Sequence, residues 1–154
     1  MSFDINEFLQ SQVSEPISAT RPQVPAGRWL ARIGELDGGA GVEAWIKPPT
    51  GNATSPRLDV PFVVLDDTVK AEMGRSTAPT LTQGYWLNVK SGTSQLDSKN
   101  NADLGQLLSA LKIQSGSPLG MFGQLPGGGP VYVTVAPDRK DPSRMRVVKV
   151  EAAS

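Results

Sequence analysis

One amphipathic helix stands in a chain whose other patterned segments resemble strands. Between residues 101 and 113, leucines recur at the three-, four- and seven-residue spacings that form the apolar face of a helix: Leu104, Leu107, Leu108 and Leu111. Three segments with strand-like alternation precede this helix, and two follow it. The position of the helix within this order constrains the fold more than any other feature.

The expected strands cover residues 27–37, 57–65, 84–90, 131–135 and 144–151, with a short returning strand at 42–47. Three strands, a helix and two strands is the order of the five-stranded OB-fold barrel, whose strand 2–3 face and adjoining loops bind oligonucleotides and oligosaccharides. The 154-residue length suits one domain of this kind. We therefore predict a mainly β fold: a five-stranded OB-like barrel over residues 25–154, with one helix between strands 3 and 4. Residues 1–24 read as an N-terminal arm, either a flexible tail or a partner-binding segment.

The composition argues against catalysis. The chain contains neither cysteine nor histidine, which excludes disulfides, thiolate zinc sites and cysteine nucleophiles and removes the commonest general base. The adjacent carboxylates Asp66 and Asp67 would point to opposite faces of a strand, so they cannot act as an acid and base pair. The glycine-rich run at 126–130 lacks the order of a phosphate-binding loop. We expect a protein that is not an enzyme, with no catalytic residues, no metal site and no cofactor.

Charge and hydropathy limit the partners and the location. Fifteen basic residues balance fifteen acidic ones, so any attraction to nucleic acid has to come from one local surface. No apolar run approaches the roughly 20 residues of a membrane span, and the first residues lack the pattern of a signal peptide. We expect a cytoplasmic protein without a membrane partner.

Aromatic and basic residues on the outward face of the expected strands indicate single-strand nucleic-acid binding. Such a protein needs cations along a groove and flat side chains on which bases stack. If Trp29, Leu87 and Val133 point inward, alternation sends a second set outward: Arg28, Arg32, Trp86, Asn88, Lys90 and Tyr132. The alternative is that Trp86 is covered by the arm or by residues 91–100 and belongs to the core.

Two further groups of residues are candidates. Trp45 and Lys47 begin the proline-rich loop that ends at Arg57, where the first long loop of an OB-fold grips its ligand, although loop charges can also serve solubility alone. The densest basic cluster is Arg139, Lys140, Arg144 and Arg146. Because Asp138 and Asp141 neutralise part of it, an ordinary solvated hairpin is the favoured interpretation.

Three features resemble a known family. They are the entry to the first strand with Pro25, Gly27 and Trp29, the leucine-rich helix at 103–113, and the Val-Tyr-Val-Thr-Val strand at 131–135. Over residues 24–151 the chain resembles the small OB-fold proteins of bacteriophages, some of which are single-stranded-DNA-binding proteins encoded among replication and recombination genes. Many such proteins end in an acidic tail that recruits partners, whereas residues 150–154 hold one carboxylate, so the arm is the better candidate for protein contacts.

The resemblance implies a phage protein, in the cytoplasm of a bacterial host, that coats single-stranded DNA during replication or recombination. Its partners would be single-stranded DNA, further copies of itself in a homo-oligomer, and replication or recombination proteins. The expected DNA-binding residues are Arg28, Arg32, Trp45, Lys47, Arg57, Trp86, Lys90 and Tyr132. Two alternatives stay open: a phage structural or assembly protein that self-associates through its arm, and an oligosaccharide-binding barrel.

Overall fold

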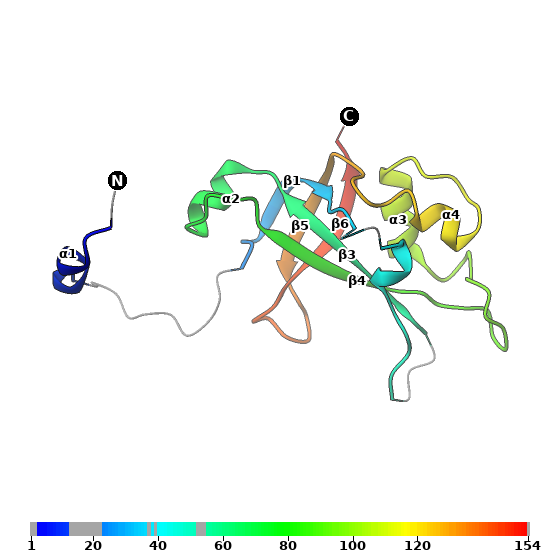
Figure 1. Cartoon of the computed structure of the whole chain (residues 1–154). Helices are drawn as coiled ribbons and strands as arrows, with labels where there is room; N and C mark the ends of the chain where they lie inside the picture. Colours follow the sequence, from blue (N-terminus) through cyan, green and yellow to red (C-terminus); the bar gives the residue numbers. More distant parts are fainter. Residues whose placement is uncertain (1–2, 13–22, 37, 39, 52–54, 154) are drawn as a thin grey trace.

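The fold is mainly β, as predicted. The computed structural model describes residues 3–12, 23–36, 38, 40–51 and 55–153 (Figure 1). One antiparallel sheet contains six strands: β1 Gly27–Ile33, β2 Ile46–Lys47, β3 Arg57–Val64, β4 Thr80–Trp86, β5 Val131–Pro137 and β6 Met145–Ala152. Four α-helices and one 3-10 helix accompany it: α1 Ile5–Gln10, α2 Asp67–Glu72, α3 Ala102–Ala110, α4 Pro118–Phe122 and η1 Val42–Trp45.

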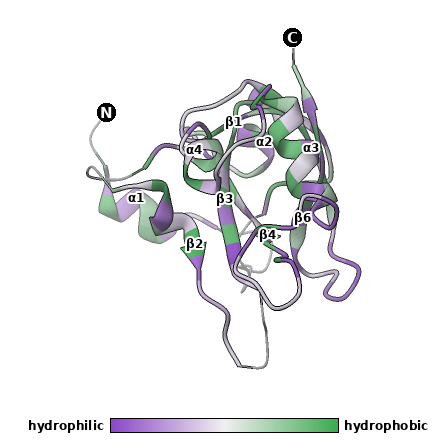
Figure 2. Cartoon of the chain, turned by 90° about the vertical axis from the view of Figure 1, so that its right-hand side faces the viewer, coloured by the Kyte–Doolittle hydropathy of each residue, from purple (hydrophilic) through white to green (hydrophobic). Residues whose placement is uncertain are grey.

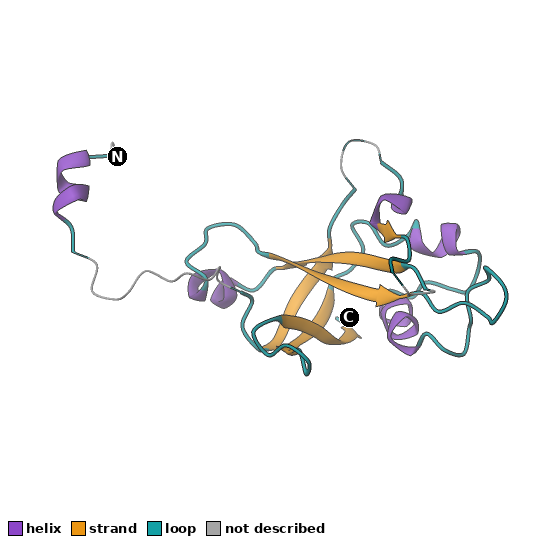
Figure 3. Ribbon diagram, turned by 90° about the horizontal axis from the view of Figure 1, so that it is seen from below, coloured by secondary structure: helices purple, strands orange, loops and turns teal. Residues whose placement is uncertain are grey.

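The sheet bends so that β3 and β4 run across the group formed by β1, β5 and β6 (Figures 1 and 3). The strands are ordered β2-β3-β1-β5-β6. Strands β2 and β1 pair with the two ends of one edge of β3, and β4 pairs with the opposite edge. The five long strands and α3 follow the predicted order, three strands before the helix and two after it. This order brings the last strand, β6, beside β4.

Alternation of apolar residues explains why these segments form strands. Leu58, Val60, Phe62 and Val64 of β3 are fully buried, as are the inward valines of β5, Val131 and Val133. The intervening side chains of β3 point to the outer face, beginning with Arg57. The same alternation on neighbouring strands makes one apolar interior and one polar outer face.

The predicted closed barrel is not what the described strands form, because no strand pairing joins β4 to β6. Glutamine side chains bridge this seam instead. Gln83 of β4 accepts from the N–H of Val147 at 2.9 Å, and Gln106 of α3 accepts from the N–H of Val150 at 3.0 Å. Helix α3 packs against both β6 and β4, so it covers the seam.

Several element boundaries differ from the prediction. In place of a strand at 42–47, the chain forms η1 and the two-residue β2. Strand β4 begins at Thr80 and ends at Trp86, so Lys90 lies in the following loop rather than on a strand. Helices α1, α2 and α4 add to the single helix that was expected.

Helix α3 also ends earlier than predicted. It stops at Ala110, because Lys112 takes a left-handed conformation with φ 59° and Ile113 donates back to the carbonyl of Leu108. Asn101 occupies the N-cap position but makes no capping bond. Its side chain accepts from the N–H of Asn88 at 2.9 Å and donates to the carbonyl of Asn88 at 3.0 Å, so it ties the helix to the end of β4.

The predicted arm divides into described and undescribed parts. Residues 1–2 and 13–22 lie outside the described residues. Val24 is buried in the core, and Gln23 is hydrogen-bonded to Ser143 and Met145, so packing against the sheet already begins at Gln23. Helix α1 has no buried residue.

Candidate nucleic-acid interface

A row of predicted site residues crosses the outer face of three neighbouring strands. Lys47 of β2 lies opposite Arg57 of β3, and Arg57 lies opposite Trp86 of β4. Residues that are directly opposite in adjacent strands project on the same side of the sheet. The sequence-predicted residues Lys47, Arg57 and Trp86 therefore meet on one surface.

Within this row, Trp86 presents an indole to solvent. The residue is 55% exposed, so it is not the core residue of the alternative interpretation. The guanidinium carbon of Arg57 lies 6.0 Å from the centre of the Trp86 ring, at the outer limit of a cation–π contact. An exposed aromatic face beside a cation is the arrangement that base stacking with a nearby phosphate contact requires.

Arg57 is held in place by its neighbours. Its Nε donates to Asp59 Oδ1 at 2.7 Å, and its Nη2 donates to Asp59 Oδ2 at 3.2 Å. Gly84 lies opposite Asp59, and a Cβ atom there would come within 2.6 Å of Arg57 Cδ. Glycine at this position thus lets the arginine side chain lie across β4 toward Trp86.

Beside Trp86, a groove of about 500 Å³ opens between β4 and the hairpin that joins β5 to β6. Trp86 lines it from β4, Arg144 and Arg146 line it from the hairpin, and Asn88 and Asn100 close one end. We call this space the β4 groove. The basic hairpin, interpreted from the sequence as ordinary solvated structure, thus contributes two cations to the same hollow as the exposed indole.

Some polar groups of the β4 groove have hydrogen-bond partners and others do not. Arg146 Nε is buried and has no hydrogen-bond partner in the described part of the protein. Hydrogen bonding by the N–H of Lys140 lowers the pKa of Asp138, so this carboxylate stays ionised and engaged with the hairpin turn. Burial raises the pKa of Tyr85, whose phenol stays protonated on the groove wall. A ligand would therefore meet the two arginines of the hairpin, with Asp103 and Asp138 as negative charges beside them.

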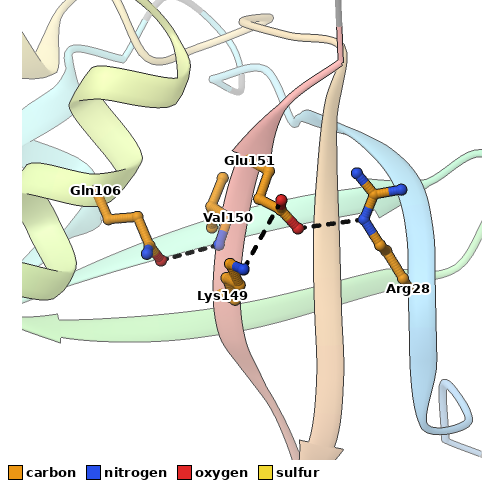
Figure 4. Close-up of polar contacts among 5 residues, drawn as sticks. All are labelled: Arg28, Gln106, Lys149, Val150 and Glu151. Carbon is orange, nitrogen blue, oxygen red and sulfur yellow. Dashed lines mark hydrogen bonds and ion pairs between the residues drawn. The ribbon is translucent and has the colours of Figure 1, made fainter.

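A second group of predicted residues, Arg28 and Tyr132, lies on the outer face of β1 and β5, and Figure 4 shows Arg28 beside Glu151 of β6. Arg28 stacks over the ring of Tyr132, with 3.9 Å between the guanidinium carbon and the ring centre. Its Nε also bonds Glu151 Oε1 at 3.2 Å, while Lys149 Nζ lies 3.8 Å from Glu151 Oε2. Because Arg28 covers the ring of Tyr132, this ring is less open to a ligand than the exposed indole of Trp86.

The eight predicted residues do not form one continuous surface. Arg32 on β1 pairs with Val63, which is six residues along β3 from Arg57, roughly 20 Å at the usual rise of a strand. Trp45 is half-buried against the core, and Lys90 is exposed on the loop after β4. Lys47, Arg57 and Trp86 form one group, and Arg28 and Tyr132 form another.

No protein-family model, curated protein or solved structure matches this chain. Across the residues that the structure describes, no helix is long and apolar enough to cross a membrane. The same residues contain no group of three or more histidine, cysteine, aspartate or glutamate side chains that could hold a metal ion. The geometry of the outer sheet face and the β4 groove is therefore the basis for a functional assignment.

Proposed function

We propose that this protein binds single-stranded DNA without strong sequence preference and is not an enzyme. The binding surface runs from the row Lys47, Arg57 and Trp86 into the β4 groove. The observation that carries the proposal is the exposed Trp86 indole, with Arg57 on one side and a groove containing Arg144 and Arg146 on the other. The predicted order of strands and helix supports it by analogy, because OB-folds bind oligonucleotides on the corresponding strands and loops.

In this mechanism, stacking and charge have separate roles. A base stacks on Trp86, and because every base has a flat face, this contact tolerates any sequence. Lys47 and Arg57 meet the phosphates on one side of the stacked base, and Arg144 and Arg146 meet them on the other. These local cations supply the attraction that the balanced net charge of the chain does not. Asn88 and Asn100 line the same groove, where their side-chain amides already donate to the carbonyl of Asn100 and to Asp97.

The direct test measures binding of a fluorescently labelled oligothymidylate by anisotropy. Oligothymidylate has no internal pairing, so affinity reports contacts with an unpaired strand. Trp86→Ala should weaken binding roughly 5- to 150-fold, the equivalent of the ~1–3 kcal/mol of one stacked base. Leu119→Ala, which changes an even more exposed apolar residue on α4, should leave affinity unchanged. Absence of binding by the unaltered protein, or equal affinity of the Trp86 variant, contradicts the proposal.

Competitors define the ligand class. Unlabelled single-stranded DNA should displace the probe far better than duplex DNA of the same sequence, because stacking on Trp86 requires an unpaired base. A neutral oligosaccharide, the ligand of the third hypothesis, would bind with little dependence on salt, whereas DNA affinity should fall as salt rises.

In the cell we propose a phage protein that coats single strands in the cytoplasm of a bacterial host, beside replication or recombination proteins.

The second candidate, a phage structural or assembly protein, is favoured by one observation. Helix α1 has no buried residue and exposes the large apolar side chains of Ile5, Phe8 and Leu9. A tryptophan fluorescence titration separates the two candidates, since an oligonucleotide should quench Trp86 in a DNA-binding protein and change nothing in an assembly protein.

A further inference from the structure

Helix α1 is amphipathic, and none of its residues is buried in the part of the chain that the structure describes. Asp4 caps it by accepting from the N–H of Asn6 at 2.9 Å. Ile5, Phe8 and Leu9 share one side of the helix, and Phe3 packs on Phe8 with 5.4 Å between ring centres. These four side chains are between 59% and 74% exposed. Six residues are too few for a helix to be stable in water without packing, so α1 needs an apolar surface.

An apolar groove of about 520 Å³ lies on the outer side of α3. Its floor is formed by Leu104, Gly105 and Leu108 of α3 together with Met121 of α4. Residues 94–98 form one wall, and Ser115, Gly116 and Pro118 form the other. A second hollow of similar volume, lined by Ile113, continues from it over Gly105 and Leu108. We call this space the α3 groove.

Gly105 keeps the α3 groove open. A glycine within a helix lowers helix stability relative to alanine. Nothing lies within 4 Å of a Cβ atom built at Gly105, so no packing within the chain requires glycine there. The absent side chain instead leaves room over the helix for an external group.

We propose that α1 of one copy docks in the α3 groove of a second copy, and that the reciprocal contact forms a two-fold dimer. In a single chain, α1 and the groove-bearing α3 and α4 lie at opposite ends of the molecule (Figures 1 and 3). When each of two copies places its α1 in the α3 groove of the other, both apolar surfaces are covered. The same contact then forms twice, as in a two-fold interface. Hydropathy colouring shows the two-sided character of α1 (Figure 2).

The available area fits a stable dimer. The four apolar side chains of α1 expose together about 500 Å², taking ~200 Å² for a fully exposed side chain of this size. Two helices and the two grooves that receive them would bury about 2,000 Å², at the upper end of the ~1,200–2,000 Å² of a specific interface. The α3 groove shares only Asn101 and Leu104 with the β4 groove, so the dimer leaves the proposed DNA surface free.

Sedimentation of the full chain without DNA tests the docking. The unaltered protein should sediment as a dimer at micromolar concentration. Gly105→Arg should sediment as a monomer, because the new side chain fills the groove, and it should stay folded because arginine favours a helix more than glycine does. Gly105→Ala should remain dimeric. Phe8→Asp should dissociate the dimer, whereas Gln10→Asp, which adds the same charge to the polar side of α1, should not.

Disulfide trapping establishes which surfaces meet. The chain has no cysteine, so Leu9→Cys and Leu108→Cys can be made in two separately tagged chains and mixed under oxidising conditions. A disulfide joining the two different chains supports the proposal. Any of four results would overturn it. The parent is monomeric, Gly105→Arg is dimeric, crosslinks form only between two Leu9→Cys chains, or, in a chain that carries both cysteines, the disulfide forms only within that chain. Because no DNA is present, these outcomes are independent of the oligonucleotide experiment.

Discussion

The seam between β4 and β6 gives the sharpest stability prediction. Gln83 supplies the side-chain acceptor for the N–H of Val147, a residue that is only 4% exposed. Replacing Gln83 by leucine keeps a similar side-chain size but leaves this buried N–H without a partner. A buried donor that loses its acceptor costs about 1–3 kcal/mol of unfolding free energy. The change should therefore lower stability by roughly that amount, and Gln106→Leu, which removes the acceptor of the equally buried Val150 N–H, should have a similar effect.

Urea unfolding followed by tryptophan fluorescence measures the loss of unfolding free energy relative to the parent protein. The midpoint should move to lower urea for Gln83→Leu with an unchanged slope, because the area exposed on unfolding stays the same. Gln83→Glu is the matched control, since its carboxylate can still accept from Val147 and lies near Arg146. A leucine variant as stable as the parent would mean that another group satisfies Val147, and the account of the seam would be wrong.

Four other outcomes are expected. Arg144→Gln should reduce the slope of log affinity against log salt by about 0.7, the contribution of one single-strand phosphate, whereas Arg139→Gln on the same hairpin should not. Tyr132→Ala should leave oligonucleotide affinity unchanged within twofold, because Arg28 covers its ring on a different part of the sheet. Leu107→Ala should destabilise the protein by about 2–5 kcal/mol in the same urea assay, because Leu107 is fully buried. Hydrogen bonds from Lys99 and Asn100 lower the pKa of Asp97 below its ordinary 3.8, so its stabilisation holds above that value and is lost as pH falls further; melting temperatures measured from pH 6 to pH 3 should fall more for the parent than for Asp97→Asn.

Local alternation was enough to predict the strand interiors. In β3 and β5 the apolar residues recur at every second position, and the prediction that they face inward is confirmed by the burial of Phe62 and Val133. For the shorter helices, the sequence indicates at most a single helical turn at α1 and at α2 and none at α4, because each spans only a turn or two. Their caps are visible in the sequence, with Asp66 before α2 and Ser117 before α4, but single polar residues of this kind also begin ordinary turns.

Long-range contacts explain what the sequence pattern could not decide. Whether Trp86 is exposed depends on where distant segments lie, and the structure places no described segment over it. The start of β4 at Thr80 follows from its pairing with β3, because the residues before Gly84 alternate only weakly. Arg144 and Arg146 reach the β4 groove because the hairpin folds beside a strand about 60 residues earlier in the chain, a distance that local patterning does not cover.

The side chain of Asn101 couples two parts of the molecule that are 13 residues apart in sequence. It holds both backbone groups of Asn88 and also donates to the carbonyl of Asp97, so the exit of β4 and the first turn of α3 are fastened together. Two sides of the β4 groove are thereby rigid with respect to each other. Any widening that admits ligands of different thickness must come from the opposite side, where residues 138–144 form a turn. The hairpin would then move relative to β4 and α3, which stay fixed to each other.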